Sequence, residues 1–255
     1  MPDEPRLEEQ ALSEAAERTI ATQLDEVENI DVDVRTDLLK MVQGQVDSVS
    51  IAAQGLVTQK DIRVQEIELH TDSIAIDLLS ALFGQIELNQ PVDATARLVL
   101  TEQDINRALN SDYIRSKFPS LELNVEGQIV TLEPQQLEVH LPGGDKMGFS
   151  GTILLHEMGE IRRLGFTAMI RPGTMKQPLL LEAVHCTEGD GISLEFAIAF
   201  IKKAGELVNL PYVELEGMAL RIKKLDLQEG SLTLHTDAYV RQLTNLTSEI
   251  VKDNI

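Results

Sequence analysis

The chain alternates apolar and polar residues over long stretches, as expected of β-strands that bury one face. In three places this alternation slips by one residue, each time at two adjacent polar or charged residues. These pairs are Gln65-Glu66, Arg162-Arg163 and Lys223-Lys224. One extra residue in a period-two pattern predicts a β-bulge, which bends a strand and increases its twist. Long strands with repeated bulges favour a curved antiparallel sheet, whose apolar concave face wraps a helix or encloses a cavity.

The expected strands and helices follow one another without a βαβ rhythm, so the sequence predicts an α+β fold with an antiparallel sheet. Strands are expected over 29–36, 46–58, 61–76, 86–100, 121–132, 136–141, 147–156, 160–170, 178–186, 213–227 and 231–240. Helices are expected over 7–27, 38–43, 77–84, 101–113 and 193–209. The helix over 193–209 is apolar nearly all round, which predicts that it is buried.

Two local signals predict where elements begin and turn. Thr101 is followed three residues later by Asp104, an Asp-for-Glu version of the capping box that opens a helix. The pair Glu133-Pro134 predicts a hairpin turn, because proline suits a turn and cannot donate to a strand ladder.

The domain organisation is expected to have three parts. Residues 1–27 form an acidic amphipathic helix, residues 28–243 a single α+β domain and residues 244–255 a polar tail. The apolar stripe of the first helix is Leu12, Ala16, Ile20, Leu24 and Val27.

The composition narrows the range of partners. In 255 residues there are 22 Lys and Arg against 42 Asp and Glu, a net charge of −20, which opposes binding to nucleic acid. The chain has no Trp, six Phe and three Tyr, so its interior is aliphatic rather than a platform for stacking bases.

The cysteine content and the start of the chain predict a location. A single cysteine, Cys186, cannot form an intramolecular disulfide, which fits either a reducing compartment or indifference to redox conditions. The opening Met-Pro-Asp-Glu-Pro lacks the basic start and apolar run of a secretory signal, and no segment approaches the roughly 20 apolar residues of a membrane span. We therefore expect a protein that is cytoplasmic or peripheral to an internal membrane.

The candidate catalytic residues are two histidines in a repeated Leu-His-Thr-Asp sequence, His70 and His235. In a strand each shares a face with the Asp two residues later, but neither lies near a recognisable Ser or Cys nucleophile motif. Cys186 is expected to be a small buried hydrophobe, and the histidines show no metal-ligand spacing. The sequence therefore predicts no enzyme, no cofactor and no metal site.

Apolar side chains on separate expected helices are the remaining candidates for a site, with ordinary core packing as the alternative. The candidate lipid-binding residues are Leu79, Phe83, Ile105, Leu109, Tyr113, Phe118, Phe196 and Phe200. Strands longer than the usual five or six residues, together with the bulges, favour a cavity around something elongated.

Three segments resemble the LmeA-like phospholipid-binding proteins, which are found in actinobacteria and cyanobacteria. The sequence as a whole is more similar in style to the cyanobacterial members. The three segments are Gly44-Gln45-Val46-Asp47-Ser48-Val49 with Gly55-Leu56-Val57, LTEQDINRALNSDYI at 100–114 and GMALRIKKLDLQEGSLTLHTDA at 217–238. The resemblance, over about 20–240, implies a long curved sheet wrapped around helices, as in tubular lipid-binding (TULIP-like) domains, with an apolar groove for acyl chains. Actinobacterial members are exported and this chain shows no signal, so a role in envelope glycan assembly is not carried over.

The favoured hypothesis is therefore non-enzymatic binding or transfer of phospholipid or glycolipid in an apolar groove. Two loops that join positive charge to an apolar residue are expected to touch a membrane briefly, with ordinary surface loops as the equal alternative. Their residues are Arg115, Lys117, Arg171, Met175 and Lys176. The alternative is a protein-interaction scaffold that uses the acidic N-terminal helix or a sheet edge, and a hydrolase acting on lipid at His70 or His235 is the least favoured reading.

Overall fold

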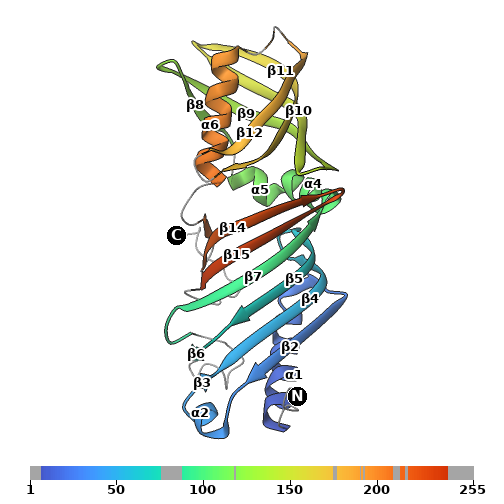
Figure 1. Cartoon of the computed structure of the whole chain (residues 1–255), viewed down its shortest axis with the longest axis vertical. Coiled ribbons are helices and arrows are strands. Elements are labelled where there is room, and N and C mark those ends of the chain that lie inside the picture. The colour runs from blue at the N-terminus through green and yellow to red at the C-terminus, as the bar shows by residue number, and fades with distance from the viewer. Residues whose placement is uncertain are drawn as a thin grey trace, which may run out of the picture.

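The computed structural model describes residues 7–75, 88–117, 119–174, 177–189, 191, 193–208, 213–215 and 218–240. Two open antiparallel sheets follow one another along the long axis of the molecule, with helices α4 (Glu102–Asn110) and α5 (Asp112–Lys117) near their junction (Figure 1). The expected α+β fold with a long, curved and bulged antiparallel sheet is confirmed. The expected helix over 77–84, with Leu79 and Phe83, lies outside the described residues.

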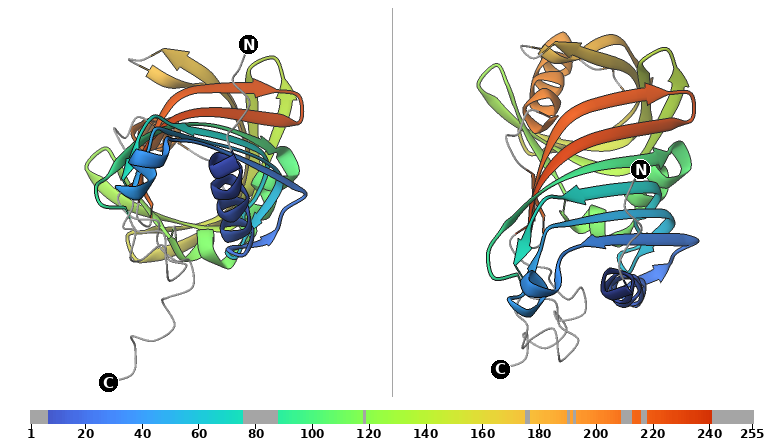
Figure 2. Two further views of the ribbon diagram at one scale, coloured as in Figure 1. Left: turned by 90° about the horizontal axis from the view of Figure 1, so that it is seen from below. Right: turned by 60° about the horizontal axis from the view of Figure 1, so that its bottom comes forward.

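The larger sheet has the strand order β1-β4-β5-β7-β15-β14-β13, and β2 also pairs with β4. Its strands are β1 Leu24–Glu26, β2 Asn29–Arg35, β4 Ser48–Thr58, β5 Arg63–Thr71, β7 Val92–Thr101, β13 Val213–Leu215, β14 Met218–Gln228 and β15 Ser231–Val240. A two-stranded ladder joins β3 (Gln45–Val46) to β6 (Ile74–Ala75). The sheet is strongly curved, and α1 (Leu7–Ala21) and α2 (Leu38–Val42) lie inside the curve (Figure 2).

The smaller sheet is a meander with the order β12-β11-β10-β9-β8. Its strands are β8 Leu121–Val125, β9 Gln128–Gly143, β10 Lys146–Glu157, β11 Glu160–Thr174 and β12 Gln177–Glu188. Helix α6 (Leu194–Val208) packs against the two edge strands, β8 and β12. The expectation that α6 is buried all round is wrong for its outer face, where Leu194 and Ile198 are 70% and 59% exposed.

The bulge predicted at Lys223-Lys224 is confirmed. Ile222 pairs with Thr236 and Lys224 with His235, so β14 holds one more residue than β15 at Lys223. Because of this extra residue, Ile222 and Leu225 face the same side of the sheet although they are three positions apart.

The other two predicted slips do not appear as insertions between the neighbouring strands. Pairing of β4 with β5 passes from Gln54–Glu66 to Leu56–Val64 without a change of register, and the irregularity lies at Gly55, which has a φ of +59°. The β10–β11 ladder is regular through Arg162-Arg163. The register shifts of β11 instead occur against β12, at Gly165/Phe166 and Met169/Ile170.

The hairpin expected at Glu133-Pro134 is wrong, because β9 runs straight through both residues. The turn lies earlier, at Glu126 and Gly127, which have φ values of +51° and +89°. Pro134 is tolerated because β8 pairs with β9 only as far as Leu132 and because the β9–β10 register shifts beside Pro134. Proline in a sheet is confined to such unpaired or bulged positions.

The first helix is shorter than expected, since α1 ends at Ala21 and not at residue 27. The chain then forms β1, in which Leu24 pairs with Thr58 at the end of β4. The stripe residues Leu12, Ala16 and Ile20 pack against a core cluster that contains Val32 and Val34 of β2.

Helix α1 also supplies hydrogen-bond acceptors along the outer edge of β2. The backbone N–H groups of Val32, Val34 and Thr36 donate to Glu17 Oε1 (3.1 Å), Ser13 Oγ (3.0 Å) and Glu9 Oε1 (3.1 Å). Four residues of helix rise about 6 Å and two residues of strand about 6.6 Å, so the two spacings match. An edge that would otherwise be open to another strand is thereby closed.

Helix α4 joins the two sheets by the same kind of contact. The Asn106 side chain donates to the Val139 carbonyl (2.8 Å) and accepts from the Val139 N–H (2.7 Å), while Glu102 Oε2 accepts from the Leu141 N–H (2.6 Å). The predicted capping box of Thr101 and Asp104 is confirmed. Asp104 is 2% exposed and forms an ion pair of 2.9 Å with Arg63 of β5.

Replacing Ser13 by alanine is expected to lower the free energy of unfolding by about 1 kcal/mol. The change leaves the Val34 N–H without a partner, which costs about 1–3 kcal/mol, and the better helix propensity of alanine offsets about 0.5 kcal/mol of this loss. Urea unfolding of Ser13→Ala and of the control Glu14→Ala, an exposed neighbour, measures the difference. Equal losses in the two variants would contradict the edge-closing role.

Replacing Asp104 by asparagine is expected to lower the free energy of unfolding at pH 7 by about 2–4 kcal/mol, because it breaks a buried ion pair. Burial alone would raise the pKa of Asp104, but hydrogen bonds from the Thr101 hydroxyl and amide and from Arg63 outweigh it and leave the pKa lowered. The stabilisation is therefore complete above the ordinary value of 3.8 and is lost as the pH falls through the lower folded value.

Urea unfolding between pH 7 and pH 2 measures this effect. The Asp104→Asn variant should lose less stability than the wild type over the acid part of that range, while the exposed control Asp93→Asn should follow the wild type. Parallel curves for Asp104→Asn and the wild type would contradict the assignment.

Candidate functional site

The inner face of the larger sheet is apolar from one side to the other. Cross-strand pairing places side chains of β2, β4, β5, β7, β15 and β14 in continuous rows on this face. One row is Val32, Ile51, Leu69, Ala96, Thr236 and Ile222, and the next is Ile30, Ala53, Ile67, Leu98, Leu234 and Leu225. A further row on this face begins with the Val34–Val49 pair. In the three rows from this pair to the Ile30–Ala53 pair, the two polar side chains are Thr71 and Thr236.

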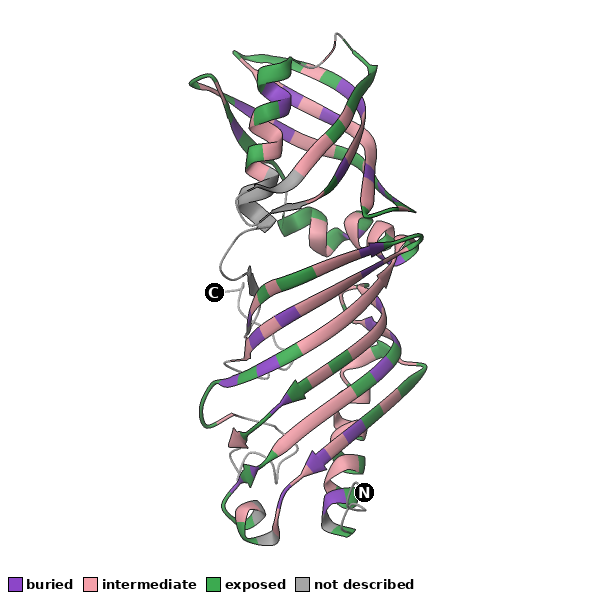
Figure 3. Cartoon of the chain, viewed as in Figure 1, coloured by how far each residue is buried: buried purple, intermediate pink, exposed green. Residues whose placement is uncertain are grey.

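Described helices pack on the two ends of this face. Helix α1 packs on β2, where Val32 and Val34 are 2% and 5% exposed, and α4 contacts β5 and β7 at the other end. Between them, Leu69, Leu98 and Ile222 are half-buried. Figure 3 shows intermediate burial along much of the middle strands of the larger sheet. The central inner face is therefore a continuous apolar surface that the described helices do not cover.

The candidate lipid-binding residues that the structure describes fall into separate places. Ile105 and Leu109 of α4 pack in the cluster that joins the two sheets, together with Val139 and Leu141. Phe196 of α6 is buried in the core of the smaller sheet, and Phe200 packs against the same cluster. Phe118, like Leu79 and Phe83, lies outside the described residues. The structure does not bring Ile105 and Phe196 into one cluster, and their contact with lipid stays a prediction.

The candidate membrane-rim residues differ in their surroundings. Arg115 and Lys117 are exposed on α5, next to the half-buried Tyr113. Arg171 instead forms an ion pair of 3.1 Å with Glu182, whose pKa is lowered by a hydrogen bond from Lys146. Met175 and Lys176 lie outside the described residues.

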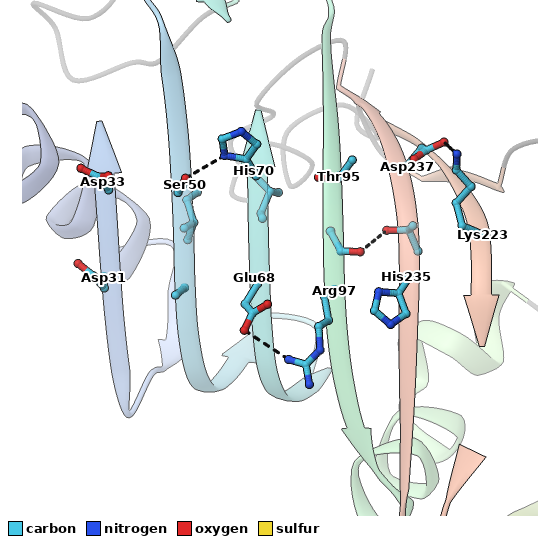
Figure 4. Close-up of a pocket in the computed structure, with 15 residues that line it drawn as sticks. Asp31, Asp33, Ser50, Glu68, His70, Thr95, Arg97, Lys223, His235 and Asp237 are labelled. Atoms are coloured by element: carbon cyan, nitrogen blue, oxygen red, sulfur yellow. Dashed lines mark hydrogen bonds and ion pairs between the residues drawn. The ribbon is translucent and has the colours of Figure 1, made fainter. Parts of the chain in front are cut away.

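The outer face of the same sheet carries a polar groove of about 470 Å³ (Figure 4). His70, Thr95 and Asp237 lie in one cross-strand row, and Glu68, Arg97 and His235 in the next. The two Leu-His-Thr-Asp sequences thus flank β7 on either side. Most charges in the groove are paired, as in the contacts of Arg97 with Glu68 (3.4 Å) and of Lys223 with Asp237 (2.9 Å).

Ser50 is a candidate nucleophile that the sequence analysis missed, because it lies 20 residues from His70 and follows no local motif. Ser50 Oγ is 2.9 Å from His70 Nδ1, and His70 Nε2 is 3.2 Å from Asp72 Oδ1. A catalytic triad needs a carboxylate that is shielded from water and an oxyanion hole beside the serine. The Asp72 side chain is 99% exposed, so water reaches its carboxylate and the shielding that a triad needs is lacking at Asp72.

Other candidate chemistry is limited in the described part of the chain. Cys186 is exposed and not buried as expected, because it lies on the edge strand β12, where its Sγ donates to the Glu188 carbonyl. Within the described ranges no group of three or more His, Cys, Asp or Glu is placed to hold a metal ion. None of the described helices is both long enough and apolar enough to cross a membrane.

The curved antiparallel sheet with an apolar inner face and helices inside the curve agrees with the fold that the resemblance to LmeA-like proteins implies. In the family comparison, the LmeA-like phospholipid-binding family matches residues 4–237. The chain therefore belongs to the LmeA-like phospholipid-binding family. Searches of curated proteins and of solved structures gave no match.

We expect the Ser50→Ala variant to behave like the wild type towards phospholipid vesicles, with no release of fatty acid above the buffer background. The reason is the exposure of Asp72, which leaves His70 without a shielded carboxylate. Gas chromatography of free fatty acids measures this release. Release by the wild type that disappears in both Ser50→Ala and His70→Ala would show that the sheet carries a hydrolase site.

Proposed function

We propose that this protein is a non-enzymatic carrier that binds phospholipid acyl chains on the inner face of the larger sheet and transfers the lipid between membranes. The observation that carries the proposal is the set of apolar rows that the described helices leave half-covered. Family membership supports lipid binding, and the apolar rows support the inner face as the proposed site. Glycolipid, which shares the acyl chains, is the second ligand class of this proposal.

The size of the inner face suits an acyl chain. Six strands spaced about 4.8 Å apart give a surface about 24 Å wide, whereas one leaflet of a membrane has a hydrocarbon depth of roughly 15 Å. Burial contributes about 0.8 kcal/mol for each CH₂ group, so eight methylene groups contribute about 6 kcal/mol. The acyl chains would therefore supply most of the affinity, and the rim of the sheet would supply selectivity.

The structure leaves fewer surfaces for a partner protein than the scaffold alternative assumed from the sequence. The apolar stripe of α1 packs on its own sheet, and α1 side chains close the β2 edge. The exposed side of α1, where Glu14 pairs with Arg18, and the end strands other than β2 are the surfaces that this alternative retains. No observation on the chain favours it over lipid binding.

Native mass spectrometry of the purified protein, before and after mixing with phosphatidylcholine vesicles, tests the proposal. We expect a lipid adduct on the wild type and a five- to thirtyfold lower occupancy for Leu98→Gln, since a polar amide on this face costs about 1–2 kcal/mol. Thr95→Gln, an exposed outer-face change on the same strand, is the matched control and should bind as the wild type does.

Circular dichroism and urea unfolding establish that both variants are folded. A wild-type protein that acquires no lipid would overturn the proposed function. Equal occupancy of Leu98→Gln and Thr95→Gln would show that the lipid lies elsewhere.

A further inference from the structure

One polar side chain on the inner face of the larger sheet is buried without a hydrogen bond. Thr71, the last residue of β5, is 4% exposed, and its hydroxyl forms no hydrogen bond with the described residues. Among those residues it is the one side chain with a buried polar atom in this situation. Proteins rarely leave a buried hydroxyl unpaired, because the hydrogen bonds it made with water are then lost without replacement.

The side chains that flank Thr71 on the sheet are apolar. Cross-strand pairing places Val49 of β4 on one side and Ala94 of β7 on the other. Thr236 occupies the equivalent position in the second Leu-His-Thr-Asp sequence, but its hydroxyl donates to the Ala96 carbonyl at 3.5 Å. Of these two inner threonines, only Thr71 therefore keeps a hydroxyl that can donate to a ligand.

Thr71 lies where the covered part of the inner face meets the uncovered part. Val49 packs against the cluster on which α1 also packs, whereas Leu69, the next residue on the same face of β5, is half-buried. Because no hydrogen bond fixes the Thr71 side chain, rotation about χ1 between staggered positions can turn the hydroxyl towards Leu69. From Thr71 the apolar face continues along β5 to Ile67, four residues and about 13 Å away.

The chemistry of a lipid limits which of its atoms can pair with this hydroxyl. Methylene groups offer no hydrogen-bond acceptor, and a charged headgroup is costly to bury in an apolar surface. The ester carbonyl that joins an acyl chain to glycerol is a neutral acceptor directly beside the chain. A hydroxyl donates readily to a carbonyl oxygen, so an ester at this position would satisfy Thr71.

We infer that the Thr71 hydroxyl binds the ester carbonyl oxygen of a glycerolipid whose acyl chain extends over Leu69 towards Ile67. The inference rests on the proposed function, because the apolar face holds the chain and Thr71 fixes where the chain begins. It adds a chemical preference to that function. Lipids with ester-linked chains are favoured over lipids that have the same headgroup but ether-linked chains, which lack the carbonyl.

The test compares uptake of two phosphatidylcholines with the same chain length, one a diester and the other a diether. Native mass spectrometry measures the uptake of each lipid from vesicles, and the ester-to-ether ratio is compared between variants. We expect this ratio to be about two- to tenfold higher for the wild type than for Thr71→Val, the range that one neutral hydrogen bond provides. Thr71→Ser keeps a hydroxyl and should retain a ratio close to that of the wild type.

Thr95→Val is the matched control, because it removes a threonine hydroxyl from the exposed outer face and should keep the wild-type ratio. Urea unfolding without lipid separates a ligand-binding hydroxyl from a structural one. Thr71→Val should be as stable as the wild type or more stable, since valine replaces an unpaired buried hydroxyl by an apolar group of similar shape. A clear loss of stability in Thr71→Val would show that the hydroxyl serves the fold and would overturn the inference.

The outcomes for the ester site and for the carrier are distinguishable. If the wild type takes up both lipids and Thr71→Val has the same ester-to-ether ratio, the ester site is overturned and the carrier remains. If the wild type takes up neither lipid, both proposals are overturned.

Discussion

The arrangement of the two sheets depends on the hydrogen bonds that α4 side chains make with backbone groups. Asn106 forms both hydrogen bonds of a strand neighbour with Val139, and Glu102 accepts from Leu141, so the helix takes the place of a strand beside β9. Asp104 anchors the same helix to β5 through Arg63. Because backbone groups near a junction must find partners, these contacts fix where the smaller sheet meets the larger one. The apolar inner face ends where the two sheets meet. Ile105 and Leu109 pack in the cluster at this junction.

The same geometric match operates at the opposite end of the larger sheet. Acceptors four residues apart on α1 meet N–H groups two residues apart on β2, as Glu102 and Asn106 of α4 meet Leu141 and Val139 of β9. The shared cause is the near equality of four helical rises and two strand rises. An open sheet with one apolar face is prone to pair with other chains. Closing the β2 edge with polar side chains protects it without covering the central inner face.

Much of the fold follows from local patterns in the sequence, while the site depends on contacts between distant segments. The alternation of Ile222 and Leu225 across Lys223-Lys224 revealed a true bulge, and the spacing of Thr101 and Asp104 revealed a true capping box. Pro134 was misread as a turn because its tolerance depends on where the neighbouring strand β8 stops, which no local pattern contains. The same limitation applies to Ser50 beside His70, whose proximity is created by strand pairing. The apolar rows were implicit in the alternation, whereas lipid contact was predicted for helical Leu and Phe residues, of which Phe196 lies in the core of the smaller sheet.

The division of the larger sheet into two faces separates the apolar surface proposed for lipid from the charged side chains. Each strand alternates, so a residue that adds charge to the outer face, such as Arg97, lies directly between inner residues such as Ala96 and Leu98. The outer charges pair mostly with one another across strands, which keeps that face hydrated and discourages stacking of sheets. The inner face stays continuously apolar only if each strand keeps its pairing register with its neighbours. In β14 the bulge at Lys223 keeps both Ile222 and Leu225 on the inner face. Curvature then turns this continuous surface towards itself, so that the acyl chain of the proposed function would contact several strands at once and be removed from water along its length.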